Sequence, residues 1–115
     1  MKILIIEDDK HLTLEFKVQL ESFDIKTSIA YNGVEAYKIL CNTHKKHQFD
    51  YIIVDLGLPD ENGVEIIKFI KTKFTSKIII YTRKNYDDYK DKCEYDHFIL
   101  KKKSSVQDVI DLILQ

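Results

Sequence analysis

Acidic side chains follow two apolar runs of the sequence, at the point where each run ends. Asp55 closes the run Tyr51–Val54, and the cluster Glu7–Asp9 closes the run Ile3–Ile6. Because open α/β sheets place their ligand sites at the carboxyl ends of the strands, these carboxylates are expected to meet at one edge of a sheet. Carboxylates that converge in this way need a cation, and their oxygens are ligands that Mg²⁺ prefers. The sequence therefore predicts a magnesium site to which Asp8 and Asp55 supply oxygens.

Two further strand ends complete the predicted site. Thr82 ends the fourth apolar run with a hydroxyl, and Lys101 ends the fifth with an ammonium. A backbone carbonyl near Gly57 and waters would fill the coordination shell of Mg²⁺, while Glu7 would act through a water molecule. The three carboxylates are then balanced by the ion and the lysine. One carboxylate oxygen is left free to attack a phosphoryl group, whose own oxygens meet these cations.

Each of these residues also has an ordinary structural interpretation. An aspartate after a strand is most often a turn former or a helix cap, and Asp9 is expected to cap the first helix. Thr82 alone is an ordinary strand residue, and the run Lys101–Lys103 alone is typical of a solvated turn. Acid, acid, hydroxyl and lysine at successive strand ends together favour the site. The four histidines lack the spacing of a transition-metal site, and the chain has no phosphate-binding loop, dinucleotide fingerprint or nucleophile elbow.

The elements that must position these residues alternate along the chain. Short apolar runs predict five strands, at Ile3–Ile6, Ile25–Ile29, Tyr51–Val54, Ile78–Tyr81 and Phe98–Leu100. Apolar residues at helical spacing lie between and after them: Leu12, Phe16, Leu20 and Phe23; Ala36, Tyr37, Leu40 and Cys41; Val64, Ile67, Ile70 and Phe74; Val106, Val109, Ile110 and Ile113. Strands that are almost continuously apolar and alternate with helices predict a parallel sheet covered on both faces, a doubly wound α/β sandwich of five βα units.

The last two predicted helices differ in the strength of their patterns. The segment Asn85–Cys93 has only two tyrosines and a cysteine on its stripe, among charged residues, so this fourth helix is expected to be short or frayed. The final helix has the clearest apolar stripe, and Ser104 or Ser105 is placed to cap it.

Length and charge limit the classes of function. The chain has 115 residues with 44% hydrophobic composition, which suits one domain over residues 1–115. A net charge of -1 and a pI of about 6.4 favour neither nucleic acid nor an anionic membrane as partner. There is no secretory signal pattern and no apolar run long enough for a membrane span. Cys41 and Cys93 are expected to be buried free thiols, so the cytoplasm is the predicted location.

Four motifs together resemble the receiver domain of two-component response regulators. They are Ile3–Asp9, Asp50–Gly63, Ile78–Thr82 and Phe98–Lys101, and the resemblance covers essentially the whole chain. It implies a flavodoxin-like fold with strand order 2-1-3-4-5. It also implies a signalling domain that modifies only itself, not an enzyme acting on other substrates, and that controls a partner or an output domain, with transcription regulation as one output.

The resemblance implies a phosphorylation chemistry. Asp55 accepts a phosphoryl group from a phosphohistidine on a sensor histidine kinase or a phosphotransfer protein, and Lys101 pairs with that group. The implied cofactor is Mg²⁺, held by Glu7, Asp8, Asp55 and Gly57. Because an aspartyl phosphate carries about one more negative charge than a carboxylate, donors at the strand ends are drawn toward it.

A conformational switch is implied as well. Thr82 swings toward the phosphoryl oxygen and Phe98 turns inward, so that the face of the fourth helix, fifth strand and last helix repacks by a population shift. The same face is the one through which partners bind or a homodimer forms. The tyrosines at positions 86, 89 and 95 are able to supply an aromatic contact there.

Several features depart from the family pattern. Arg83 stands where a small residue usually follows Thr82, and it would cover the site, slow entry of a donor or water, or reach the phosphoryl group. Lys102 replaces the usual proline, so the peptide bond before it is expected to be trans and the loop shifted. The stretch from Thr82 to Phe98 is shorter than usual, and Glu94–Tyr95 replaces a Gly-Ala turn.

Two other interpretations compete with a phosphorylated receiver. An atypical receiver would act as a phosphorylation-independent interaction or dimerisation module, and Arg83 together with the missing proline supports it. A phosphatase of the haloacid dehalogenase type also uses an aspartyl nucleophile. Such an enzyme needs a second aspartate two residues later, where this chain has Gly57. Without that acid, only activated donors are expected to react.

Overall fold

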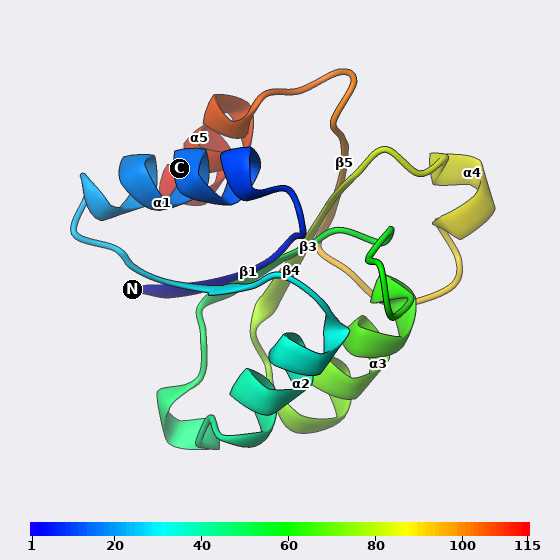
Figure 1. Ribbon diagram of the computed structural model, residues 1–115, viewed down its shortest axis with the longest axis horizontal. Coiled ribbons are helices and arrows are strands. Elements are labelled where there is room, and N and C mark those ends of the chain that lie inside the picture. The colour runs from blue at the N-terminus through cyan, green and yellow to red at the C-terminus, as the bar shows by residue number, and fades with distance from the viewer.

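The computed structural model describes residues 1–115 and contains one sheet of five parallel strands in the order β2-β1-β3-β4-β5 (Figure 1). The strands are β1 Lys2–Ile6, β2 Lys26–Ala30, β3 Tyr51–Val54, β4 Lys77–Thr82 and β5 His97–Leu100. Each boundary lies within one residue of its prediction. The predicted doubly wound α/β fold and its strand order are confirmed.

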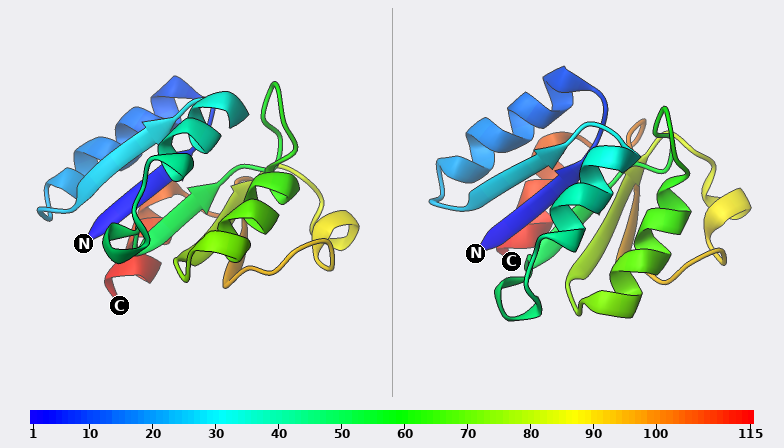
Figure 2. Two further views of the ribbon diagram at one scale, coloured as in Figure 1. Left: turned by 90° about the horizontal axis from the view of Figure 1, so that it is seen from below. Right: turned by 60° about the horizontal axis from the view of Figure 1, so that its bottom comes forward.

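Helices cover both faces of this sheet. They are α1 Lys10–Glu21, α2 Gly33–Cys41, α3 Gly63–Lys73, α4 Tyr86–Tyr89 and α5 Val106–Leu114, and a 3₁₀ turn spans Lys45–His47. Helices α1 and α5 lie on one face and α2 and α3 on the other, while α4 lies at the side of the molecule near β5 (Figures 1 and 2). None of the helices combines the length and the apolar character that crossing a membrane requires.

The sheet separates two apolar clusters. In β1, Leu4 and Ile6 pack with residues of α2 and α3, and Ile3 and Ile5 pack with residues of α1 and α5. All four side chains are fully buried. Both faces of the central strands are therefore covered, which explains why these strands are continuous apolar runs and not alternating ones. The packed sheet fixes the strand ends from which the polar residues project.

Capping residues determine where the helices begin. Asp9 caps α1, as predicted, and its carboxylate accepts hydrogen bonds from two amides of the first turn. Ser105, and not Ser104, caps α5 in a reciprocal arrangement with Asp108. Both caps lie at the carboxyl edge of the sheet, so the chain turns into a helix directly after the polar residues.

Two predictions about single apolar residues are wrong. Phe23 is 54% exposed, because α1 has ended and the chain turns through Asp24, with a left-handed φ of 61°, before it enters β2. Cys41 is exposed at the end of α2, and Cys93 is half-buried; both are free thiols. In both places the helical stripe continues in the sequence after the sheet has ceased to cover it.

The fourth helix is a single turn. It has four residues and none is buried, so the predicted segment Asn85–Cys93 is short, as expected. Tyr86 of this turn and Tyr95 of the following loop place their rings edge-on to Phe98, at centroid distances of 5.0 and 5.4 Å. This region is held by aromatic contacts with β5 in place of an extended helix interface.

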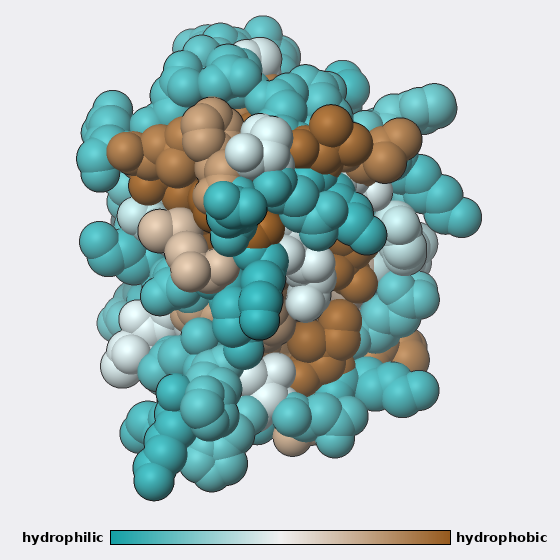
Figure 3. All heavy atoms as spheres, turned by 90° about the vertical axis from the view of Figure 1, so that its left-hand side faces the viewer, coloured by the Kyte–Doolittle hydropathy of each residue, from teal (hydrophilic) through white to brown (hydrophobic).

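Apolar groups on the side of the amino terminus are interspersed with hydrophilic ones (Figure 3). Large apolar residues exposed anywhere on the molecule are Met1, Leu14, Val18, Phe23, Val34, Tyr86 and Leu114. Single exposed apolar side chains are normal on a protein surface. The most distinctive polar feature is at the opposite edge of the sheet.

Candidate functional site

The carboxyl ends of β1, β3, β4 and β5 surround a polar pocket of about 360 Å³. No hydrophobic residue lines it, and its nine lining residues are Glu7, Asp8, Asp9, Asp55, Gly57, Thr82, Arg83, Lys84 and Lys101. The structure therefore brings together every residue that the sequence predicted for the metal and phosphoryl chemistry, with Arg83 at the rim. Phe98, the predicted switch residue, lies outside this lining.

Asp55 receives three hydrogen bonds in this pocket. Its Oδ1 accepts from the Thr82 hydroxyl at 2.7 Å and from the Gly57 amide at 3.1 Å, and its Oδ2 accepts from the Lys101 ammonium at 2.9 Å. Burial, which leaves Asp55 8% exposed, raises the pKa of this carboxyl, but the three hydrogen bonds hold the pKa below its ordinary value. Asp55 is therefore an ionised carboxylate near neutral pH, the state that a nucleophile needs.

Lys101 joins two carboxylates. Its Nζ lies 2.5 Å from Glu7 Oε1 and 2.9 Å from Asp55 Oδ2. Burial lowers the pKa of this ammonium, but the hydrogen bonds and charges of Glu7 and Asp55 raise it above the ordinary value of a lysine. The peptide bonds of the chain are all trans, as predicted for the bond before Lys102. The ammonium is thus a permanent positive charge beside Asp55.

Glu7 is almost completely enclosed. Its Oε1 faces Lys101, and its Oε2 accepts a hydrogen bond from the Asp9 amide at 3.0 Å. Burial is the main cause of a pKa raised to about 7, and the negative charge of Asp55 adds to the rise while Lys101 opposes it. A carboxyl in this state gives up its proton when a divalent cation supplies further positive charge.

The carboxylates have the spacing of a divalent-cation site. Glu7, Asp8 and Asp55 each offer one oxygen, and these oxygens lie within 4.8 Å of one another. Hard anionic oxygens are the ligands of Mg²⁺, and three carboxyl groups face the single ammonium of Lys101 here. The donor set therefore fits Mg²⁺. Asp8 is exposed, and Gly57 lines the pocket with its carbonyl as a predicted further ligand.

A glycine lets α3 begin directly against the backbone of Asp55. Gly63 is the first residue of α3, and a Cβ at this position would lie 2.5 Å from the carbonyl oxygen of Asp55 and 2.7 Å from the Cα of Leu56. The Gly63 amide also donates to the Leu56 carbonyl at 3.1 Å. The backbone that carries Asp55 is therefore fixed by the start of a packed helix.

The loop between β3 and α3 is tied to α2. Asp60 accepts hydrogen bonds from the amides of Gly33 and Val34, at 2.7 and 3.1 Å, where α2 begins. The bond from Gly33 is the main cause of a lowered pKa at Asp60, partly opposed by desolvation. An isolated bridge between Gly57 and Asn62 closes the same loop. The side of the pocket that contains Gly57 is thus anchored to a neighbouring helix.

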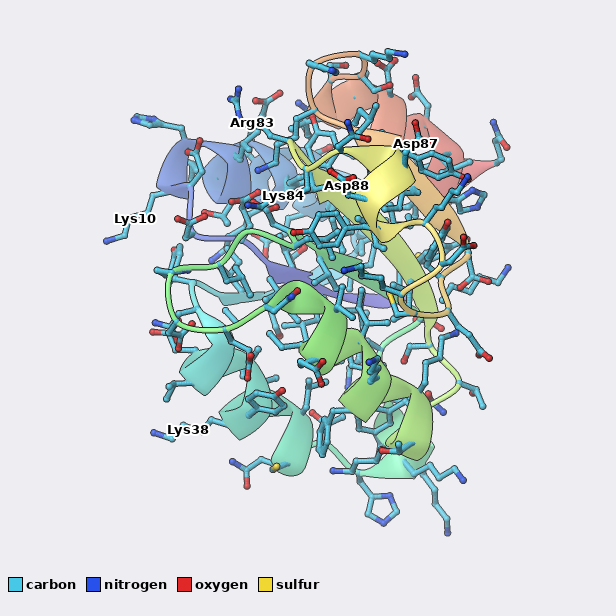
Figure 4. All side chains as sticks on the ribbon, turned by 90° about the vertical axis from the view of Figure 1, so that its right-hand side faces the viewer. Lys10, Lys38, Arg83, Lys84, Asp87 and Asp88 are labelled. Carbon is cyan, nitrogen blue, oxygen red and sulfur yellow. The ribbon has the colours of Figure 1, made fainter.

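Two basic residues follow β4 and lie on different sides of the pocket (Figure 4). Arg83 is exposed and also lines a neighbouring pocket against α1. Lys84 lies over Gly57, where a Cβ would come 3.1 Å from the lysine Cε. Sequence reasoning missed Lys84, because its approach depends on the absence of a side chain at position 57. The glycine two residues after Asp55 is the signal that could have indicated it.

The two predicted switch residues lie on neighbouring strands. Thr82 is fully buried, donates to Asp55, and accepts a hydrogen bond from the Lys84 amide at 3.2 Å. Phe98 pairs in register with Ile80 of β4, and its half-buried ring packs on the cluster beneath α2 and α3. Thr82 in the pocket and Phe98 outside it are therefore connected through the pairing of β4 with β5.

Comparison with known proteins places the chain in a family. The sequence model of one protein family, the response regulator receiver domain, matches residues 3–113. The chain belongs to this family. The receiver domain is 39% identical over 85 residues to the response regulator ArlR of Staphylococcus saprophyticus and 35% identical over 86 residues to ArlR of Staphylococcus aureus. Each alignment covers 73% of this chain and 36% of the relative, so the chain spans about a third of the length of these relatives.

Solved receiver structures share the fold. A two-component response regulator from Clostridium difficile superposes with a TM-score of 0.86 and 26% identity, over 98% of this chain and 92% of that one. The receiver domain of the Francisella response regulator 1452 gives a TM-score of 0.82 and 22% identity, over 98% and 93% of the two chains. The resemblance based on the four sequence motifs is confirmed, and the chain is a receiver domain of two-component signalling.

Proposed function

We propose that this receiver domain accepts a phosphoryl group on Asp55 with Mg²⁺ bound beside it. The surroundings of Asp55 support this most strongly. Its ionised carboxylate accepts hydrogen bonds from a hydroxyl, an amide and an ammonium. Two further carboxylates lie next to it, at the spacing of a cation site. Glu7, Asp8 and Asp55 would hold the ion. When bound, Mg²⁺ offsets the negative charge of the transferred group.

The transfer is a displacement at phosphorus. A carboxylate oxygen of Asp55 forms a bond to phosphorus while the bond from phosphorus to the donor nitrogen breaks. The electron pair of that bond leaves with the imidazole of the phosphohistidine, which departs neutral when its other nitrogen carries a proton. The Lys101 ammonium and the Thr82 hydroxyl, which bind the free carboxylate, then donate to the phosphoryl oxygens.

The donor must carry a good leaving group. No histidine lines the pocket, and position 57, where a second acid would be needed, is glycine. Glu7 does not supply the missing acid, because its oxygens bind Lys101 and the Asp9 amide. Nothing in the pocket is therefore placed to protonate an alkoxide, and the donors we infer are phosphohistidine and acyl phosphates.

The proposed partner is a sensor histidine kinase or a phosphotransfer protein in the cytoplasm. Output would pass through Thr82 and Phe98 to the face formed by α4, β5 and α5, where a partner or a second copy binds. Tyr86 and Tyr95 already pack on Phe98 within the chain, although Tyr86 remains exposed. A homodimer through this face would therefore contact a surface that changes when Phe98 moves.

Intact mass after incubation with Mg²⁺ and acetyl phosphate tests the proposal. The protein should gain one phosphoryl group, and Asp55→Asn should prevent the gain. Asp50→Asn is the matched control, because Asp50 is an exposed carboxylate that directly precedes the first residue of β3, whereas Asp55 directly follows the last one. Phosphate uptake that survives Asp55→Asn would contradict the assignment of the acceptor. No uptake by the unaltered chain would favour a phosphorylation-independent interaction module.

A further inference from the structure

Tyr81 is a buried aromatic residue next to the site, and neither the metal nor the acceptor uses it. It lies on β4, is 4% exposed, and its ring packs edge-on to Phe16 of α1 at a centroid distance of 5.8 Å. The Lys101 Nζ lies over the same ring, 5.9 Å from its centroid. The Tyr81 hydroxyl donates a hydrogen bond of 2.7 Å to the carbonyl of Ser104. One side chain therefore contacts both Lys101 and the loop that follows it.

That loop has few other connections. Its backbone folds on itself through bonds from the amides of Lys103 and Ser104 to the Leu100 carbonyl, at 3.0 and 3.1 Å. The Tyr81 hydroxyl is the only side-chain group that hydrogen-bonds the backbone of residues 101–104. The side chains of Lys102 and Lys103 are exposed, and three successive lysines repel one another. The chain has no proline there to restrict the backbone.

There is also space into which this arrangement could relax. A pocket of about 240 Å³ adjoins the acceptor pocket, and Tyr81 and Lys101 line it together with Asp9, His11, Leu12, Glu15 and Arg83. Lys101 lines both pockets, and its ammonium lies over the Tyr81 ring while it contacts Glu7 and Asp55. A loop released from Ser104 would let the ammonium turn toward Glu15 and Asp9.

We propose that Tyr81 is a positioning residue for Lys101: its hydroxyl holds the loop at Ser104 and its ring supports the lysine, so that the ammonium points at Asp55. This inference rests on the proposed function, because the ammonium matters for phosphoryl transfer only if Asp55 is the acceptor. The hydroxyl is kept as a donor, since burial raises the pKa of Tyr81 above its ordinary value.

Tyr81→Phe tests the inference, because it removes the hydroxyl and keeps the ring on Phe16. Thr43→Val is a matched control: the Thr43 hydroxyl also donates to a backbone carbonyl, that of Ile39 at 2.7 Å, but it lies just after α2 and does not line the pocket. Each variant is made with Lys101 present and with Lys101→Ala. The readouts are the rate of phosphorylation by acetyl phosphate with Mg²⁺, thermal unfolding, and hydrogen exchange of the Lys103 and Ser104 amides.

The expected pattern is specific to a positioning role. Losing one hydrogen bond should slow phosphorylation of Tyr81→Phe by about three- to tenfold, and should not slow Thr43→Val. The effect should disappear in the Lys101→Ala background, while both variants lower the melting temperature in either background. The Lys103 and Ser104 amides should exchange about tenfold faster in Tyr81→Phe.

Three results would overturn the inference. They are an unchanged rate in Tyr81→Phe, a rate loss of equal size when Lys101 is absent, and unchanged exchange of the loop amides. If the unaltered protein takes up no phosphate, the proposed function fails instead. The amide exchange, which needs no phosphorylation, then decides alone whether the Tyr81 hydroxyl holds the loop.

Discussion

The unit formed by β3 and α3 and the connection from β4 to β5 border the same pocket but are built differently. Helix α3 has eleven residues and buries five of them, whereas α4 has four residues and buries none. No residue of the connection Arg83–Asp96 is fully buried. The first unit carries Asp55, and the second separates Thr82 from Lys101. The difference indicates that the strand that carries Asp55 is fixed, while Thr82 and Lys101 border a weakly packed segment.

This division suits a phosphorylation switch. The carboxylates must keep their spacing to hold a cation, and packing around α3 provides that. Under the proposed function, Thr82 and Lys101 would change partners when a phosphoryl group arrives, and a neighbouring segment with little buried surface deforms at low cost. We expect conformational change to spread toward α4 and Phe98, leaving α3 in place.

The largest effect is expected from a core truncation in the fixed unit. Ile67 is fully buried in α3, so Ile67→Ala should lower the free energy of unfolding by about 3 to 4 kcal/mol. Val34→Ala, at a highly exposed helical position in α2, should change it by less than about 0.5 kcal/mol. Urea unfolding followed by circular dichroism measures both. Equal losses for the two variants would show that α3 does not carry the stability assigned to it.

Glu7 should make the metal-free protein less stable as the pH rises. Its pKa is about 7 in the folded protein against the ordinary 4.5, so the folded state holds this proton more tightly than the unfolded chain does. Stability from this group is complete below about pH 4.5 and is lost as the pH rises through 7. At about 1.4 kcal/mol per pKa unit, the loss by about pH 8 is on the order of 3 kcal/mol.

Urea unfolding in EDTA, between about pH 5 and about pH 8, measures this loss. Glu7→Gln should flatten the profile and stabilise the protein at the upper end. Since the cation displaces the same proton, the affinity for Mg²⁺ should rise with pH over this range, by at most about tenfold per pH unit. A wild-type profile that rises with pH would contradict the raised pKa of Glu7.

Gly63 offers a way to disturb the acceptor from behind. A methyl group at this position meets the backbone of Asp55 and Leu56, so Gly63→Ala should cost about 2 kcal/mol and slow phosphorylation. Gly57→Ala is the matched comparison, because the one tight contact of its methyl group is with the flexible end of Lys84 at 3.1 Å, while Asp55 Oδ1 lies at 3.9 Å, an ordinary contact distance. Its cost should stay below about 0.5 kcal/mol. If both variants lose the same stability, the close contact between α3 and the acceptor strand is unimportant.

The smallest effect on stability is expected in the β4–β5 connection. Tyr86→Ala removes one ring from the contact with Phe98 and should cost about 0.5 to 1 kcal/mol. Hydrogen exchange should quicken within residues 84–96 and stay unchanged in α3. Tyr86→Phe keeps the ring and serves as the control. Faster exchange throughout α3 in Tyr86→Ala would mean that the two units are not separable.

The fold could be predicted because strands that are buried on both faces are continuous apolar runs, which are easy to recognise in a sequence. The run Tyr51–Val54 and the four other apolar runs mark the strands to within one residue. The wrong predictions concern apolar residues at or beyond the ends of helices. Phe23 and Cys41 continue the helical stripes of α1 and α2, but both are exposed. A periodic pattern indicates which face of a helix a side chain lies on. It does not indicate whether another element packs against that face.

The residues of the candidate site could be predicted from the sequence, but several contacts between their side chains could not. Topology alone requires residues at the ends of parallel strands to meet, so Asp8 and Asp55 could be placed together from the sequence. The position of Lys84 over Gly57 and the bond from Tyr81 to Ser104 depend on side-chain reach across loops. Neither leaves a periodic signal in the chain.

The bonds from Asp60 to the amides that open α2 make access to the acceptor asymmetric. The side of the pocket that contains Gly57 is thus held to a helix that contributes no residue to the pocket. A bulky protein donor must therefore displace the other side, where Arg83 lies, whereas a small acyl phosphate can enter without that displacement. Substitutions of Arg83 should alter the preference between the two classes of donor more than they alter the reactivity of Asp55.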